Sequence, residues 1–265
     1  MTLKIFIQNL LEPIYFVISI FLSKKFYKKN YQKFKRKIKN KHIYILGAGP
    51  SLNTIKIKKI YNSTIILING TYELYNKFDK SNKIFWSSCD VQRIHDLMPL
   101  LPKKLDCITS SSKYRGVTDL VSSKNQILYF HPKLSIVKKN LNFMSIFKIK
   151  IPILCPKTLF FSKKKSKYKI SDLLKENNII IPRGTSILPL LLILMKMSPK
   201  TINLFGMDMG DNKRNDYANL KFYKNVKTGI TKRDKESSKI FLNKILEKLK
   251  KNKIRFINHS AFKLD

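Results

Sequence analysis

Acidic residues are scarce in this chain: 16 Asp and Glu stand against 54 Lys and Arg in 265 residues, a formal net charge of +38. This shortage of negative charge favours an anionic partner, such as acidic lipid, nucleic acid or an anionic substrate. Compositional drift remains an equal alternative, because lysines occur in almost every segment. No basic run is interleaved with aromatic residues in an RNA-binding pattern, so we do not expect nucleic acid as the partner.

Cysteine is also rare, with only Cys89, Cys107 and Cys155, which lie far apart. No pair has the spacing of zinc ligands or of a redox couple, which argues against both disulfides and structural zinc. The four histidines are scattered without metal-ligand spacing, although His259 comes just after the last expected strand. We therefore expect no metal site, and a reducing, cytoplasmic compartment.

The chain has no uninterrupted hydrophobic run that would clearly span a bilayer. Residues 3–22 are rich in apolar residues but are interrupted by Lys4, Gln8, Asn9, Glu12 and Pro13. A lysine-rich run follows, without the small-residue cleavage site of a secretory signal. An apolar helix with a basic flank suits the acidic cytoplasmic leaflet, and a helix packed on the protein's own core is the alternative. We predict that residues 1–40 are a membrane-associating amphipathic helix and basic linker, peripheral on the cytoplasmic face of the inner membrane.

From residue 41 onward, short apolar runs recur at regular intervals. The expected strands are residues 43–46, 65–68, 84–86, 105–109, 127–130, 201–205 and 254–257. Helix-compatible sequence fills most gaps, and the clearest helices are residues 186–197 and 236–250. This alternation predicts an α/β, Rossmann-like domain with a mostly parallel sheet over residues 41–265. Residues 131–178 contain three prolines and no clear period, which indicates a lid-like insertion.

Glycine is sparse too, yet two of the eight glycines fall in one turn after the first expected strand. The turn is Gly47-Ala48-Gly49-Pro50-Ser51, and it leads into an expected helix. Glycines permit a tight turn, Pro50 suits the first helical position, and free N–H groups at a helix start favour a phosphate. The third glycine of a dinucleotide fingerprint is missing, so NAD and FAD are not expected. A plain strand-to-helix turn is the alternative.

Other polar residues follow other strands at the same expected edge of the sheet. They are Asn69, Asp90, the turn Arg183-Gly184-Thr185-Ser186, and Asp208. Ligands of an open parallel sheet bind beyond the carboxyl ends of its strands. Arg183 beside two hydroxyls predicts a second anion site, and the Asp208 carboxylate suits a ribose or substrate hydroxyl. Each residue alone is more often a cap or turn residue, but together they predict a ligand site.

These motifs also resemble two related bacterial families. The resemblance rests on GAGPSL, Asn69, RGTS, a long apolar helix, INLFGMD and the pair Tyr217-Ala218, and it spans about residues 42–260. One family is the CMP-sialic-acid-dependent sialyltransferases of lipooligosaccharide synthesis. The other is the 6-hydroxymethylpterin diphosphokinase MptE-like family, whose members include proteins of surface-glycan and flagellin-glycosylation gene sets.

The resemblance implies a set of nucleotide and donor contacts: Gly47, Gly49, Ser51, Asn69, Arg183, Thr185, Ser186, and Tyr217 as the hydroxyl that steadies the leaving phosphate. Two positions depart from the sialyltransferase pattern. Ala48 replaces an asparagine, and Ile230 falls where the family has its catalytic histidine. Isoleucine cannot transfer a proton, so the chain resembles the MptE-like family more closely, and Asp208 or Asp90 is the expected base.

The sequence thus predicts a nucleotide-sugar-dependent glycosyltransferase of cell-surface glycan assembly. Its expected partners are a nucleotide sugar, a glycan acceptor and an acidic membrane surface, with no required cofactor or metal. One alternative is a diphosphokinase that transfers pyrophosphate from ATP to a hydroxymethyl pterin. It would need Mg²⁺, held by carboxylates such as Asp90 and Asp208. A non-catalytic nucleotide-binding relative is the other alternative.

Overall fold

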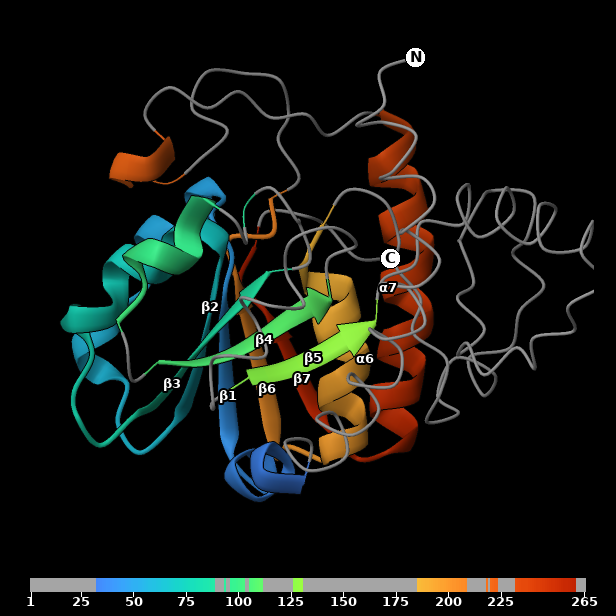
Figure 1. The fold of residues 1–265 in the computed structure, drawn as a ribbon. Coiled ribbons are helices and arrows are strands. Elements are labelled where there is room, and N and C mark those ends of the chain that lie inside the picture. Colours follow the sequence, from blue (N-terminus) through green and yellow to red (C-terminus); the bar gives the residue numbers. More distant parts are fainter. Residues whose placement is uncertain are drawn as a thin grey trace, which may run out of the picture.

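The computed structural model describes residues 32–88, 93, 96–102, 105–111, 126–130, 185–208, 218, 220–223 and 232–260. These residues form a seven-stranded sheet in which every paired strand is parallel to its neighbour (Figure 1). The strands are β1 (His42–Leu46), β2 (Thr64–Ile68), β3 (Lys83–Ser88), β4 (Asp106–Ser111), β5 (Gln126–Phe130), β6 (Thr201–Phe205) and β7 (Arg255–Asn258). Each overlaps one of the predicted apolar runs, so the α/β Rossmann-like fold is confirmed. The predicted lid, residues 131–178, lies outside the described residues.

The strand order is β5-β4-β3-β2-β1-β6-β7, which reverses direction at β1. The chain first adds strands on one side of β1 and later returns to place β6 on its other side. Tyr44 of β1 is therefore level with both Ile65 of β2 and Asn203 of β6. Ligands of open parallel sheets bind where the order reverses, outside the carboxyl ends of the strands. The topology thus predicts a ligand site at the carboxyl ends of β1 and β6.

Helices cover both faces of the sheet (Figure 1). On one face, α6 (Ile187–Met197) and α7 (Lys232–Lys251) lie side by side. The other face carries the 3-10 helices η1 (Pro50–Thr54) and η3 (Asn69–Lys77). Alternate strand residues point to the two faces and form two separate apolar cores. The parallel strands therefore read as continuous apolar runs because both of their faces are buried.

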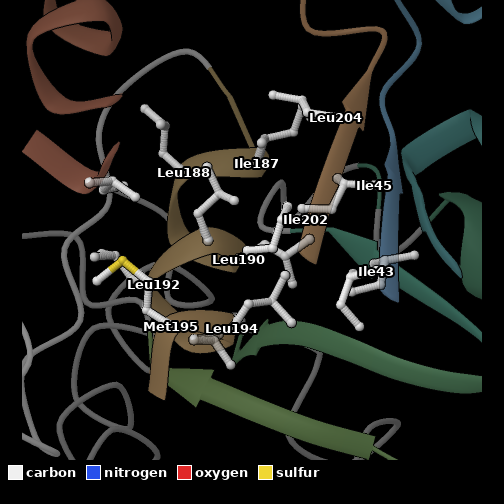
Figure 2. Close-up of a cluster of buried hydrophobic side chains, with 14 of the residues drawn as sticks. Ile43, Ile45, Ile187, Leu188, Leu190, Leu192, Leu194, Met195, Ile202 and Leu204 are labelled. Carbon is white, nitrogen blue, oxygen red and sulfur yellow. The ribbon is translucent and has the colours of Figure 1, made fainter. Parts of the chain in front are cut away.

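Helix α6 is buried on all sides, which its uniformly apolar sequence predicts. Its described side chains from Ile187 to Met195 are all at most 4% exposed. Figure 2 shows Leu190 and Leu194 pointing towards the sheet residues Ile43 and Ile202. The helix ends at Ser198, which adopts a left-handed conformation with φ 53°. The predicted helices at 186–197 and 236–250 are confirmed, and α7 begins before residue 236.

The crossovers that follow β1 and β2 differ from the α-helices that the sequence led us to expect. Residues 50–54 and 69–77 form 3-10 helices instead. The segment after Pro50 contains the β-branched residues Thr54, Ile55 and Ile57, which lower helix propensity. A short 3-10 helix has few aligned peptide dipoles, so the expected anion-attracting helix start after the glycine turn is weak.

The folded domain begins earlier than the predicted boundary at residue 41. Residues 32–38 are helical, and Phe34 and Ile38 are 1% and 0% exposed in the core shared with α6 and α7. Phe34 packs on Phe85 with ring centroids 4.8 Å apart, and Lys37 pairs with Asp106 at the start of β4. These residues are therefore part of the domain and not a basic linker. Phe34 and Ile38, four residues apart, form one apolar helix face, which the surrounding lysines make hard to recognise in the sequence. Residues 1–31 lie outside the described residues, and no helix within the described part is long and apolar enough to cross a bilayer.

Two further buried residues belong to the core. Trp86 is 0% exposed, and its side chain packs within the core of η1 and η3. Cys107 is a buried free thiol, and burial, followed by the nearby Asp106 charge, raises its pKa to about 12. A thiol with so high a pKa stays protonated and unreactive at neutral pH. Cys89 and Cys155 lie outside the described residues.

Candidate functional site

The turns that leave β1 and β6 pack backbone against backbone at the point where the strand order reverses. The Gly47 N–H donates to the Phe205 carbonyl at 2.8 Å, and the Gly49 N–H donates to the Gly206 carbonyl at 2.9 Å. Gly206 has a φ of +69°, a conformation that favours glycine. A Cβ at Gly47 would lie 2.9 Å from the carbonyl carbon of Gly206. Both positions therefore require glycine so that the two turns can approach each other.

Ser51 and Asp208 join these turns by side-chain hydrogen bonds. The Ser51 N–H donates to Oδ2 of Asp208 at 2.7 Å, and Oγ of Ser51 accepts from the Gly206 N–H at 2.9 Å. A Cβ at Gly49 would lie 2.9 Å from Cγ of Asp208. The structure thus brings together Gly47, Gly49, Ser51 and Asp208, which the sequence assigned to one site. We call this set, with Gly206, the switch-point lock.

The lock changes the expected role of the glycine turn. The N–H groups that were expected to face a phosphate are bonded within the chain at Gly47, Gly49 and Ser51, while Pro50 has none. The next N–H, from Leu52, donates to the Gly49 carbonyl at 3.0 Å. These glycines provide room for a neighbouring turn of the protein itself. The alternative interpretation, a structural strand-to-helix turn, describes this geometry better than an amide cradle for phosphate does.

Asn69, at the end of β2, has the features expected of a ligand-binding side chain. Its backbone has a φ of 51°, and its carbonyl accepts a hydrogen bond from Nε1 of Trp86 at 2.8 Å. The side-chain Oδ1 of Asn69 is buried, and no hydrogen-bond partner reaches it from the part of the chain that the structure describes. An unpaired buried acceptor costs about 1–3 kcal/mol, so each such atom calls for an explanation such as strain, a bound water or ion, or a ligand. Among the described residues, Oγ of Ser87 and Oδ1 of Asn243 are unpaired and buried as well.

The start of α6 borders the same switch point. The Ile187 N–H donates to Oγ1 of Thr185 at 3.2 Å, and Ser186 is buried. Cδ1 of Ile187 lies 3.1 Å from the position that a Cβ would take at Gly47. Thr185 and Ser186 are thus placed beside the glycine turn, at the edge where the parallel strands end.

A further segment is attached directly to the glycine turn. The Ala218 N–H donates to the Ala48 carbonyl at 2.7 Å. The following 3-10 helix, η6 (Lys221–Tyr223), is capped by Glu73, whose carboxylate accepts from the Lys221 and Phe222 N–H groups at 2.8 and 2.6 Å. Arg93 lies with its guanidinium carbon 5.0 Å from the centre of the Phe222 ring. Glu73 was not predicted from the sequence, although a carboxylate just past a strand-end asparagine is conspicuous in so basic a chain.

The end of β7 completes this edge of the sheet. The His259 N–H donates to the Leu204 carbonyl at 2.8 Å, and its ring stacks on Phe205 with centroids 4.1 Å apart and an interplanar angle of 8°. Partial burial lowers the pKa of His259 from its usual 6.5, so its imidazole is neutral at pH 7. Oγ of Ser260 accepts from the Met207 N–H at 2.9 Å. Ser260 was not predicted from the sequence, although it follows the last strand much as Asp208 follows β6.

Several predicted site residues lie outside the described part of the chain: Asp90, Arg183, Tyr217 and Ile230. Within the described part, no three His, Cys, Asp or Glu side chains gather as they do around a metal ion. No protein-family model matches the chain, and no curated protein sequence matches it.

Proposed function

We propose that this protein is a nucleotide-sugar-dependent glycosyltransferase of cell-surface glycan assembly, similar to the bacterial CMP-sialic-acid-dependent sialyltransferases. The proposal is supported by the Rossmann-like fold and by polar groups from β1, β2, β6 and β7 at one edge of the sheet. It is also supported by the sequence resemblance, whose motifs GAGPSL and INLFGMD are the two halves of the switch-point lock.

Asn69 is the observation that carries the proposal. Its Oδ1 is a buried acceptor, and the Trp86 hydrogen bond and the left-handed backbone hold it in one place. A nucleotide can supply the missing donor from a ribose hydroxyl or from the amino group of a base. The site would therefore be preorganised for the ligand, which lowers the entropy cost of binding.

The donor phosphate is assigned to the start of α6 rather than to the glycine turn. The N–H groups of Gly47, Gly49 and Ser51 are bonded within the chain, whereas α6 has 11 residues and begins at the switch point beside Thr185 and Ser186. Its N-terminal dipole and the hydroxyls favour an anion, and Arg183 is the neighbouring cation in the sequence. The hydroxyl of Tyr217, next to the anchored Ala218, would steady the leaving phosphate.

The proposed transfer needs one proton acceptor. The acceptor hydroxyl loses its proton as its oxygen bonds to the anomeric carbon, and the nucleotide phosphate leaves with the electron pair of the broken bond. Asp208 already holds the Ser51 N–H, which gives it a positioning role. His259 presents an imidazole that is neutral at pH 7, and neutral imidazole accepts protons effectively near that pH. We therefore assign the proton to His259 in place of the expected Asp208 or Asp90.

The diphosphokinase alternative rests on Mg²⁺ bound by Asp90 and Asp208. The described residues offer no specific support for it, because Asp208 is committed to the lock and Asp90 lies outside them. Adding ATP and Mg²⁺ to the binding experiment keeps this alternative testable.

The test compares Asn69→Gly with Asn62→Gly. Both asparagines have positive φ, at 51° and 48°, and they flank opposite ends of β2, so glycine preserves the backbone at each. Thermal shift and calorimetry with CMP, UDP, GDP and ATP, with and without Mg²⁺, would measure binding. We expect the wild-type chain to bind a pyrimidine nucleotide without Mg²⁺, and Asn69→Gly to weaken binding about fivefold through one lost hydrogen bond.

Asn62→Gly should bind as tightly as the wild-type chain. If no nucleotide binds, or if both variants bind equally well, the nucleotide site at Asn69 is wrong. Binding of ATP alone, and only with Mg²⁺, would replace the glycosyltransferase proposal with the diphosphokinase.

A further inference from the structure

The amino edge of the sheet, where the strands begin, carries a dense group of exposed basic side chains. Backbone hydrogen bonds hold three of their segments together: Lys200 N–H donates to the Lys41 carbonyl at 2.9 Å, and Arg255 N–H donates to the Lys200 carbonyl at 3.3 Å. Lys253 and Lys39 lie in the same turns, and all five of these side chains are exposed. We call this group the basic edge. It includes the lower end of β1 in Figure 1.

The basic edge continues across the other strand starts. Lys58 and Lys59 precede β2, while Lys80 and Lys83 lie at the start of β3, and all four are exposed. Two carboxylates lie at this edge. Asp106 pairs with Lys37, and Asp79 keeps its negative charge beside Lys80. The lysines and the arginine of the basic edge outnumber these two carboxylates, so the like charges repel one another, and an anionic partner would relieve this repulsion.

The described charged side chains are distributed unevenly between the two edges of the sheet. The described part of the amino edge is mostly basic, whereas the described part of the carboxyl edge is mixed. The described charged side chains there include Glu73, Asp208 and Glu236 beside Arg93, Lys221 and Lys235. Among the described side chains, the exposed positive charge is thus concentrated at the edge opposite the candidate site.

Two observations indicate a bilayer as the anionic partner. The chain enters the domain at the helix of residues 32–38, next to the basic edge, and the preceding sequence is the apolar segment 3–22 with its lysine flank. Tyr61, between Lys59 and β2, is 59% exposed, and tyrosine favours the interface of a membrane with water. Among the described side chains, the exposed large hydrophobics are Tyr61, Leu100 and Ile240, so there is no row of aromatics on which bases could stack.

We infer that the basic edge is a docking surface of the folded domain for an acidic lipid bilayer. Lysine and arginine side chains bind anionic headgroups through long-range attraction that adds up over the surface. The apolar segment 3–22 and the basic edge then act as two linked contacts with one membrane, which together bind more strongly than either alone. The candidate site lies at the opposite edge of the sheet, where the strands end. The inference does not depend on which reaction the site performs.

The test uses the full chain with vesicles of phosphatidylcholine, alone or with added phosphatidylglycerol, and measures the increase in partitioning caused by the acidic lipid. The variant Lys41→Glu/Lys200→Glu reverses two charges of the basic edge. The matched control Lys221→Glu/Lys235→Glu makes the same charge change at the opposite, carboxyl edge of the sheet. We expect the first variant to reduce the increase at least tenfold, and the control to reduce it less than threefold.

Circular dichroism and unfolding in urea would show that both variants fold. If both variants lose the same share of the partitioning caused by the acidic lipid, net charge alone determines binding. If Lys41→Glu/Lys200→Glu partitions like the wild-type chain, the basic edge is not part of the interface. Single-stranded RNA is the competing partner. If it binds more tightly than the acidic vesicles at the same salt concentration, and Lys41→Glu/Lys200→Glu weakens that binding, the surface binds nucleic acid and the lipid inference is wrong.

Discussion

A few residues at the switch point are shared between folding and the proposed chemistry. Asp208 and Ser51 exchange hydrogen bonds with the turns of β1 and β6, and Gly49 leaves room for the Asp208 carboxylate. Replacing Gly49 by valine would therefore disturb the protein's own packing before it affected a ligand. This is why substitutions of Asn69 and His259, which leave the lock intact, are better probes of function.

The role of His259 can be tested by the pH dependence of turnover. Burial lowers its pKa from 6.5, so a catalytic His259 is in its basic form above that lowered pKa. We expect kcat/KM to be constant near pH 7 and to fall with decreasing pH, with a midpoint below 6.5. His259→Gln should reduce kcat about 100-fold or more and leave nucleotide affinity unchanged.

His42 provides the matched control, because it lies at the opposite end of the sheet with Nδ1 2.8 Å from Oγ1 of Thr201. His42→Gln should keep both the rate and the pH profile of the wild-type protein. If His259→Gln retains full turnover, or if the low-pH midpoint persists in it, the proton acceptor is another residue, with Asp208 the first to examine.

At the residue scale, the sequence predicted which side chains meet but not how they bond. Strand-end position was enough to bring Ser51 and Asp208 to one edge, because parallel strands end on the same side of the sheet. The partner of each N–H depends on the exact path of two turns that are remote in sequence. A glycine needed for a neighbouring turn and a glycine needed for a ligand look alike in a sequence.

At the scale of single elements, α6 is a helix that the sequence pattern predicts, and the crossover after β1 is one that it does not. The α6 sequence is apolar throughout, and a helix of this composition can only be buried. The segment from Pro50 to Thr54 has no clear apolar pattern, and its local helix preferences are weak. Packing in the folded protein therefore determines its conformation, which is a 3-10 helix. Phe34 and Ile38 were overlooked because a two-residue apolar face is a faint signal among lysines.

Helix α6 should contribute strongly to stability. Leu190 is 0% exposed and points towards the sheet (Figure 2), so Leu190→Ala removes apolar contacts and leaves a cavity. We expect the free energy of unfolding to fall by about 2–5 kcal/mol. Ile240→Ala on α7 is the control: its side chain is 37% exposed, and its effect should be within about 1 kcal/mol. Urea unfolding followed by circular dichroism would measure both, and equal effects would contradict the buried position of α6.

On the scale of the whole molecule, the sheet separates two surfaces of different character. A five-residue strand spans about 17 Å, so at least that distance lies between the basic edge and the candidate site. A domain docked through the basic edge would hold its site away from the bilayer. This arrangement suits an acceptor at the outer end of a glycan better than a sugar next to its lipid anchor.

The contribution of the N-terminal segment to membrane association can be separated from that of the folded domain. Deleting residues 1–30 removes the apolar run but keeps Phe34 and Ile38, so the truncated chain should remain folded. Deleting residues 1–38 would also remove two core side chains, and we expect this second truncation to be clearly less stable.

In a membrane flotation assay, the full chain should stay bound in high salt, because screening weakens charge attraction but not apolar burial. The chain without residues 1–30 should bind acidic vesicles at low salt through the basic edge and dissociate at high salt, when the Debye length falls to about 3 Å. If it remains bound at high salt, residues 1–30 are not the apolar anchor. If it fails to bind even at low salt, the basic edge cannot hold the domain on a membrane by itself, and the lysines of residues 24–29 supply the charge-dependent part of the full chain's binding.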